Sequence, residues 1–317
     1  EAESEEQRQV AAFITRRLLV TLVVLLLVSL ISFSIMQLVP GDPATVMAGL
    51  AATDDQIRAI RVQFGLDQPF HIQLIRWYAG IAIGDMGQSM TLGRGVGQAL
   101  IERLPATLGL AMVGFVMTLV LGLGAGVIAA IRHNTWVDQL IMVLAVVGVS
   151  VPSFWLGLMM IVGFAVMLDL LPAGGYVPFA QDPKGWLVSL ILPALSLCLL
   201  QVGLLARITR SAMLEALRQD YIRTARAKGL PAWIVIGKHA MMNVMVPVIT
   251  IIGIIFSLML SGSVVIETVF SIPGLGRLMA SAILTRDYPL IQGGLLLTAA
   301  MFVLINLVVD VLYAYVD

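Results

Sequence analysis

Apolar residues occur in this chain in long stretches that polar segments separate. Six stretches contain no Asp, Glu, Lys or Arg: 18–41, 104–131, 139–168, 185–206, 239–266 and 288–309. Each is long enough for the roughly 20 residues that a helix needs to cross a bilayer. Because backbone polar groups in lipid must be paired within their own segment, the pattern predicts six membrane-spanning helices.

Two local patterns refine the predicted spans. The third stretch is the longest and contains Pro152 within GVSVPSFWLG, which has no polar turn, so we predict one span kinked at the proline rather than two. The second stretch contains GLGAG at 122–126, a glycine pattern that weakly resembles a nucleotide-binding loop. Inside a span, small residues of this kind favour close packing of helices instead.

Composition agrees with a membrane protein. The chain has 317 residues, of which 59% are hydrophobic and only 12% are charged, and its formal net charge is zero. Soluble domains are about 45–50% apolar and about 25% charged. The single cysteine, Cys198, excludes an internal disulfide and a cysteine-rich metal site. We treat 1–12 as an acidic N-terminal tail rather than a signal peptide.

The distribution of basic residues predicts the orientation. If the spans alternate in direction, one side carries most of the Lys and Arg residues near the spans: Arg16, Arg17, Arg132, Arg207, Arg210, Arg218, Arg223, Arg226, Lys228 and Lys238. The two short loops on the other side carry only Lys184, Arg277 and Arg286. Short loops rich in basic residues stay in the cytoplasm. Both termini are therefore predicted to be cytoplasmic.

The long segment between the first two spans is too polar for lipid. Thr53 and Gln56 form a capping-box pattern, and Gly65 can end the helix that follows. Pro69 is suited to the start of a second helix. We therefore divide the chain into the tail at 1–12, a first span at 13–39, an extracytoplasmic helical subdomain at 40–104, and a core at 105–317 with a cytoplasmic loop at 214–240.

No residues suggest catalysis by this chain. The sequence has no G-x-x-x-x-G-K-[ST] phosphate loop, no H-E-x-x-H and no G-x-S-x-G, and its three His residues fall in different loops or loop edges. We predict a protein that is not an enzyme and holds no cofactor or metal itself. The polar residues within the spans that could line a transport pathway are Ser29, Ser32, Gln201 and Asn306. The alternative, which we favour, is hydrogen bonding between helices.

One short segment, DYIRTARAKGL at 220–230, is unusually rich in charge for this chain. Asp220 can cap a helix, Tyr221, Thr224 and Ala225 share one face, and Gly229 can end the helix with Pro231 starting the next. A helix of two turns is too short to be stable alone, so a partner must hold it. The alternative is a basic patch that contacts anionic lipid.

This segment, followed by KHAMMNVMVPVIT, resembles the EAA loop of ABC-importer permeases of the dipeptide/oligopeptide/nickel (also glutathione) family. Further stretches along the chain share the resemblance: LVPGDPA, FGLDQP, GDMGQS, RITRSAMLEAL, ETVFSIPGLGRL, RDYPLIQGG and NLVVDVLYAYVD. The chain is most similar to the first, B-type permease of the pair. The resemblance implies an all-α integral membrane protein of about six transmembrane helices with the type I ABC importer permease fold.

The resemblance also implies the partners. These are a second homologous permease, two ATP-binding subunits or a fused pair that bind ATP and Mg, an extracytoplasmic substrate-binding protein and the lipid bilayer, with no nucleic acid. The location would be the cytoplasmic (inner) membrane of a bacterium or archaeon. In the family, the loop forms a coupling helix that contacts an ATPase. Here Tyr221, Arg223, Thr224, Ala225 and Gly229 would make that contact.

Two questions stay open at the level of sequence. A secondary transporter or channel that needs no ATPase is the alternative, although it would predict ionisable groups in mid-membrane or a filter motif. The substrate could be a dipeptide, an oligopeptide or a related small solute such as glutathione or a nickel chelate, and peptide is the first expectation.

The segment 270–289 contains Pro273, Gly274 and Gly276, and we predict a re-entrant or surface-lying loop there.

Overall fold

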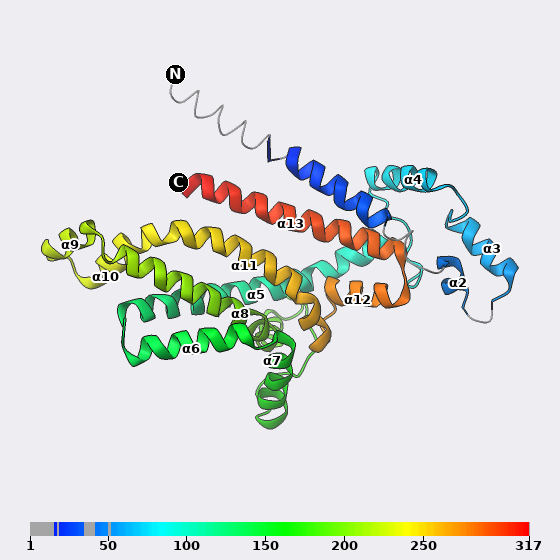
Figure 1. Ribbon diagram of the computed structural model, residues 1–317. Helices are drawn as coiled ribbons and strands as arrows, with labels where there is room; N and C mark the ends of the chain where they lie inside the picture. Colours follow the sequence, from blue (N-terminus) through cyan, green and yellow to red (C-terminus); the bar gives the residue numbers. More distant parts are fainter. Residues whose placement is uncertain (1–15, 18, 35–41, 50–51, 317) are drawn as a thin grey trace, which may run out of the picture. The chain divides into compact units, whose positions relative to one another are not determined.

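The computed structural model describes residues 16, 17, 19–34, 42–49 and 52–316, and these residues form helices joined by short loops (Figure 1). The helices are Leu19–Ser34, α2 (Pro43–Ala48), α3 (Asp54–Gln63), α4 (Phe70–Ala82), α5 (Val96–Ile131), α6 (Trp136–Ser150), α7 (Ser153–Met160), η1 (Ile161–Met167), α8 (Pro183–Ala216), α9 (Asp220–Ala227), α10 (Ala232–Ile234), η2 (Val235–Ala240), α11 (Met241–Val269), α12 (Leu275–Thr285) and α13 (Tyr288–Val316). No strand occurs among the described residues, and the all-α prediction is confirmed.

Four of the described helices are long and apolar enough to cross a membrane. They lie in α5, α8, α11 and α13, and their most apolar windows have mean hydropathies of 2.0 to 2.4. The bent pair of α6 and α7–η1 can supply a fifth span. The helix Leu19–Ser34 is the described part of the first predicted span, whose last residues, 35–41, lie outside the described residues. The predicted number of spans therefore fits approximately.

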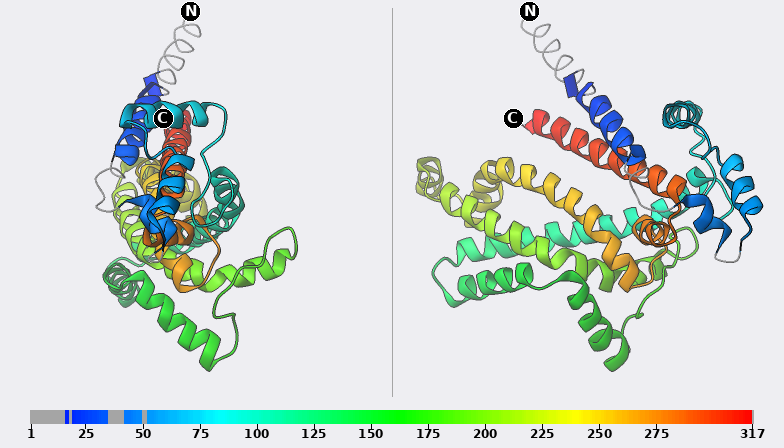
Figure 2. Two further views of the ribbon diagram at one scale, coloured as in Figure 1. Left: turned by 90° about the vertical axis from the view of Figure 1, so that its right-hand side faces the viewer. Right: turned by 45° about the vertical axis from the view of Figure 1, so that its right-hand side comes forward.

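The third predicted span is broken rather than kinked. Its two halves, α6 and Ser153–Met167, meet at an angle of 105°. Val151 and Pro152 between them have extended backbone conformations, and Pro152 caps α7. Proline disfavours a helical conformation at the residue before it, and here that restriction ends α6 altogether. Figure 2 shows α7 and η1 turning away from α6.

The described residues divide into two compact units. The first unit contains the residues up to Leu104 together with Leu278–Leu307, and the second contains Pro105–Arg277 and the end of α13 from Val308. The long helices α5 and α13 and the short helix α12 contribute residues to both units.

In the first unit, the predicted helix signals are confirmed. The backbone N–H of Thr53 donates to Gln56 Oε1 at 2.9 Å and the N–H of Gln56 donates to Thr53 Oγ1 at 3.4 Å, which completes the capping box of α3. Gly65 ends α3 with a φ of 66°, and α4 starts directly after Pro69. Tyr78 of α4 shares a hydrogen bond of 2.7 Å with Ser29 Oγ, which holds α4 against the helix Leu19–Ser34.

A buried carboxylate fixes the loop that leads into α5. Asp287 accepts hydrogen bonds from Ser89 Oγ at 2.6 Å and from Thr91 N and Oγ1 at 2.9 and 2.7 Å, and it also caps the first turn of α13 through Leu290 N. Burial alone would raise the pKa of Asp287, but the hydrogen bonds from Ser89 and Thr91 outweigh it and hold the pKa below its usual value. The loop is thus fixed to the start of α13.

In the second unit, α8 is the central helix. It packs against α6 on one side and α11 on another (Figure 1). Small residues allow the close approach: a Cβ on Gly126 of α5 would lie 2.6 Å from Thr209 Cβ, and one on Gly203 of α8 would overlap the carbonyl oxygen of Ala145 in α6. A Cβ on Gly122 would likewise lie 2.9 Å from Leu205 Cδ2 of α8, so the prediction that GLGAG packs helices together is confirmed for its first and last glycines.

Candidate coupling surface and transport residues

The predicted coupling segment forms α9, a helix of eight residues. Figure 1 shows α9 and α10 beyond the end of α8, and both follow α8 along the chain. The helix starts one residue earlier than we predicted: Gln219 occupies the N-cap position, and no side chain caps it. The prediction that Asp220 is the cap is therefore wrong. Asp220 lies in the first turn, where its negative charge still favours the helix dipole.

The inner face of α9 packs on the chain itself. Ile222 and Ala225 are 0% and 6% exposed, and they belong to the same buried apolar cluster as Met213 of α8 and Val235 of η2. These contacts explain how so short a helix is held in place. Ala225, which we predicted to contact an ATPase, is buried in this cluster and helps to seat α9, and its contact with a partner stays a prediction.

The outer face of α9 is polar and exposed. The side chain of Arg223 is 77% exposed and lies 3.4 Å from Asp220, and Thr224 Oγ1 donates back to the Asp220 carbonyl oxygen at 3.0 Å. Tyr221 is 40% exposed, and its hydroxyl accepts a hydrogen bond of 2.8 Å from Asn243 Nδ2 of α11. A hollow of about 310 Å³ lies beside Tyr221, lined also by Glu215, Gln219 and Pro247.

Gly229 ends α9 as predicted. Its φ is 76°, and the N–H of Leu230 reaches back to the Ala225 carbonyl oxygen at 3.3 Å. A residue with a Cβ at this position would carry a conformational cost of roughly 1–2 kcal/mol. That Cβ would meet no atom within 4 Å, so the cost comes from the backbone alone and not from crowding against Ala225. The next helix, α10, begins after Pro231, also as predicted.

The four pathway candidates have different surroundings. Ser29 is 2% exposed and bonded to Tyr78, while Asn306 donates to the Phe302 carbonyl oxygen of its own helix at 2.8 Å. Ser32 Oγ and Gln201 Oε1 are buried and have no hydrogen-bond partner. Ser29, Ser32 and Asn306 belong to the first unit and Gln201 to the second. The assignment of these residues to a pathway stays a prediction.

A buried carboxylate in α11 was missed by the sequence analysis. Glu267 is 0% exposed and follows the fifth apolar stretch directly, so α11 continues through it to Val269. It accepts hydrogen bonds from Thr107 Oγ1 at 2.6 Å and from Arg277 N at 2.9 Å. Thr107 Oγ1 in turn accepts one from Leu275 N at 2.8 Å. Glu267 therefore fastens the first turn of α12 to α5 and α11.

The backbone packs closely around Glu267, and glycines in the sequence indicate this packing. A Cβ on Gly274 would overlap the Glu267 carboxylate, and one on Gly276 would overlap the backbone of Val264. Both glycines and the glutamate lie within ETVFSIPGLGRL. The motif therefore encodes a tight turn with its own acceptor, which the apolar pattern alone does not reveal. A short helix, α12, follows this turn, and a re-entrant or surface-lying position for 270–289 stays a prediction.

Comparison with solved structures shows which class this architecture belongs to. The chain is similar to chains in two crystal forms of the inward-facing MetNI methionine ABC transporter, with TM-scores of 0.55 and 0.58 at 18% and 17% identity. Each match covers 69% of this chain and 97% of the other. The chain therefore shares the fold of these ABC transporter chains.

The sequence comparisons then identify the family. Residues 122–317 match the binding-protein-dependent transport system inner membrane component, and residues 10–111 match its N-terminal region. The chain belongs to this family of permeases and is a multi-pass membrane protein. The predictions of family, fold class and permease function are confirmed.

Three relatives match nearly the whole chain. A peptide transport system permease of Brucella suis biovar 1 (strain 1330) is 48% identical over 96% of this chain and 98% of its own. A D,D-dipeptide transport system permease of Escherichia coli (strain K12) is 40% identical over 92% of each chain. A glutathione transport system permease of Salmonella paratyphi A (strain ATCC 9150 / SARB42) is 41% identical over 96% of this chain and 97% of its own.

Proposed function

We propose that this chain forms half of the translocation pathway of an ATP-driven importer of dipeptides, oligopeptides or a related small solute. The observation that carries the proposal is α9, a short helix that is seated on the chain's own core and presents an exposed polar face. A helix built in this way is suited to transmit force from a soluble partner to α8 and α11. The names of the relatives support peptides as the substrate class.

Besides this chain and the bilayer, the proposed assembly contains three kinds of component. These are a second homologous permease, two ATP-binding subunits or a fused pair, and an external substrate-binding protein. ATP and Mg bind to the ATP-binding subunits, because this sequence has no phosphate-binding loop. When these subunits close on ATP, the coupling helices are drawn together and the pathway opens outward, and hydrolysis returns it to the inward-facing state.

In this assembly the residues of α9 have separate roles. Tyr221, Arg223 and Thr224 contact the ATP-binding subunit through their exposed side chains. Ala225 and Gly229 set the position of α9, since the first is buried against the core and the second allows the left-handed stop.

The docking role predicts that Arg223→Glu weakens the association with the ATP-binding subunits. Arg223 is exposed and its ion pair with Asp220 joins two exposed side chains, so the substitution should leave folding intact. We expect the amount of ATP-binding subunit that co-purifies to fall several-fold, together with ATP hydrolysis in the reconstituted complex. The matched control is Lys184→Glu, which makes the same change of charge at an exposed position far along the chain. Normal association of the Arg223→Glu variant would contradict the docking role of α9.

We propose the same orientation as the basic residues indicate, with both termini and 214–240 in the cytoplasm and the 40–104 subdomain outside. Asp55, Lys184 and Lys228 are exposed, so a single cysteine at each can report its side of the membrane. In a Cys198→Ser background, we expect an impermeant thiol reagent to label positions 55 and 184 in intact cells. Position 228 should react only after the cells are opened, and its labelling in intact cells would reverse the orientation.

A further inference from the structure

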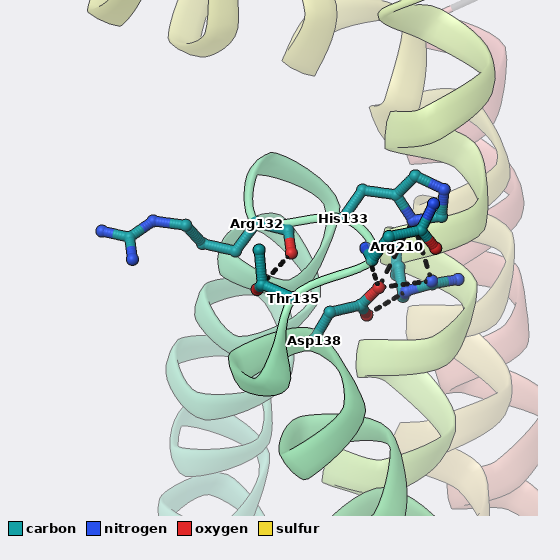
Figure 3. A network of polar contacts seen from close by, with 6 residues as sticks. Arg132, His133, Thr135, Asp138 and Arg210 are labelled. Carbon is teal, nitrogen blue, oxygen red and sulfur yellow. Dashed lines mark hydrogen bonds and ion pairs between the residues drawn. The ribbon is translucent and has the colours of Figure 1, made fainter.

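The turn between α5 and α6 is fastened to α8 by an ion pair whose carboxylate is buried and whose guanidinium is partly exposed. Asp138, in the first turn of α6, is 3% exposed. Its two carboxylate oxygens accept hydrogen bonds from Arg210 of α8, from Nε at 2.6 Å and from Nη2 at 2.7 Å (Figure 3). The two hydrogen bonds fix the relative orientation of the two groups as well as their distance.

The turn itself adds further contacts to this pair. The backbone N–H of Asn134 donates to Asp138 Oδ2 at 3.0 Å, and Asn134 has a φ of 63°. His133 Nδ1 lies 3.1 Å from Arg210 Nη2 and 3.3 Å from Asp138 Oδ2. Depending on its tautomer, Nδ1 either accepts a hydrogen bond from Arg210 or donates one to Asp138. The pair therefore holds the whole turn, and not only the first residues of α6.

The position of Arg210 relates this contact to α9. Arg210 lies near the end of α8, which finishes at Ala216 and is followed after three residues by α9. The neighbouring residue Thr209 is 0% exposed and lies where a Cβ on Gly126 of α5 would collide with it. The last turns of α8 are thus in close contact with α5 and bonded to the start of α6, immediately before the chain enters the helix that meets the ATP-binding subunit.

An ion pair of this kind contributes little net stability. The cost of removing the carboxylate and part of the guanidinium from water offsets much of their attraction, and replacement of both by neutral groups is often tolerated. The loss of Arg210 is costly, because it leaves the buried Asp138 carboxylate without its charged partner. The geometric restraint is thus the larger effect of the pair.

We propose that Asp138 and Arg210 are positioning residues that make the α5–α6 turn move together with α8 when α9 is displaced. This inference rests on the proposed function, because it takes α9 as the site where force enters. Without the pair, the end of α8 would bend or slide past α6. The rate of ATP hydrolysis would then no longer respond to the external binding protein.

The test compares variants in the reconstituted complex of both permeases and the ATP-binding subunits. The measured quantity is the rate of ATP hydrolysis with the cognate binding protein divided by the rate without it. The binding protein is used as purified. We expect Arg210→Lys, which keeps the charge but loses the paired hydrogen bonds, to lower this ratio roughly fivefold or more while basal hydrolysis is retained. The double variant Asp138→Asn/Arg210→Gln should be no worse than the Arg210→Gln single variant, because the pair acts as a unit.

The control is Arg207→Gln, which removes the same charge from an exposed position on the same helix and should leave the ratio unchanged. If the pair only stabilised the fold, its variants would lower the yield of complex but keep the ratio, and that result would overturn the inference. Arg223→Glu separates this failure from failure of the proposed function. That variant loses the ATP-binding subunits if α9 is the docking helix, whereas Arg210→Lys keeps them.

Discussion

Replacement of Glu267 by alanine is expected to destabilise the permease and to reduce the amount of assembled complex. The carboxylate accepts hydrogen bonds from Thr107 Oγ1 and Arg277 N in a fully buried site. Each donor left without a partner costs roughly 1–3 kcal/mol, so the two together cost roughly 2–6 kcal/mol. The first turn of α12 would also lose its attachment to α5, since Thr107 joins Leu275 to the same network.

The measurement is the thermal unfolding midpoint of the purified permease pair in detergent, with the yield of complex as a second readout. Glu215→Ala is the matched control for the unfolding midpoint alone, because Glu215 is an exposed glutamate on α8 of the same unit but also lines the hollow beside Tyr221. Thr107→Val removes the same hydrogen bond from the other side. The Thr107→Val/Glu267→Ala double variant should therefore lower the unfolding midpoint by less than the sum of the two single variants. An unfolding midpoint for Glu267→Ala equal to that of Glu215→Ala would show that the network contributes no stability.

The pattern of apolar residues predicted the helices well, for a physical reason. Lipid demands that backbone groups pair within one segment, so a stretch without charge is almost enough to define a span. The predicted start of α3 and the predicted end of α9 were confirmed for a similar reason, because a capping box at Thr53 and a left-handed stop at Gly229 are local features. Each involves residues within a few positions of one another.

Contacts between distant parts of the chain were not predictable in the same way. Asp138 and Arg210 are 72 positions apart, and Thr107 and Glu267 are 160 apart. Asp138, Arg210 and Glu267 each lie at or beyond the edge of an apolar stretch, where the sequence pattern predicts contact with water. The burial of Ala225 could not be predicted either, because a helical face identifies neighbours on the helix but not whether the face meets the same chain or a partner.

The break at Pro152 shows the limit of a local rule. Proline in an apolar stretch predicts a disturbance of the helix, and the disturbance lies where it was expected. Its size depends on what the two halves pack against. In the second unit α6 packs along α8, and α7 also contacts α8 and α11, so both halves have their own contacts. An angle of 105° is then compatible with two helices that each keep their own packing contacts.

The glycines of GLGAG provide a second test, in which one substitution has opposite effects at two positions. In a helix interior, Gly→Ala is intrinsically stabilising by about 1 kcal/mol. A Cβ on Gly124 would meet no atom within 4 Å, so Gly124→Ala should keep this gain. A Cβ on Gly126 would lie 2.6 Å from Thr209 Cβ and 2.7 Å from the Ala206 carbonyl oxygen. There α5 and α8 must separate, and overpacking of this kind costs roughly 1–3 kcal/mol.

We therefore expect Gly126→Ala to lower the unfolding midpoint of the purified permease pair and Gly124→Ala to leave it unchanged or raise it. The Cβ added by Gly126→Ala would collide with Thr209, the residue next to Arg210. The substitution should therefore also lower the stimulation of ATP hydrolysis by the binding protein. Gly124→Ala introduces the same methyl group two residues away and serves as the control. If both variants unfold at the same temperature as the unmodified protein, α5 and α8 are not packed as closely as this structure places them, and the seating of α8 against α5 would have to depend on other contacts.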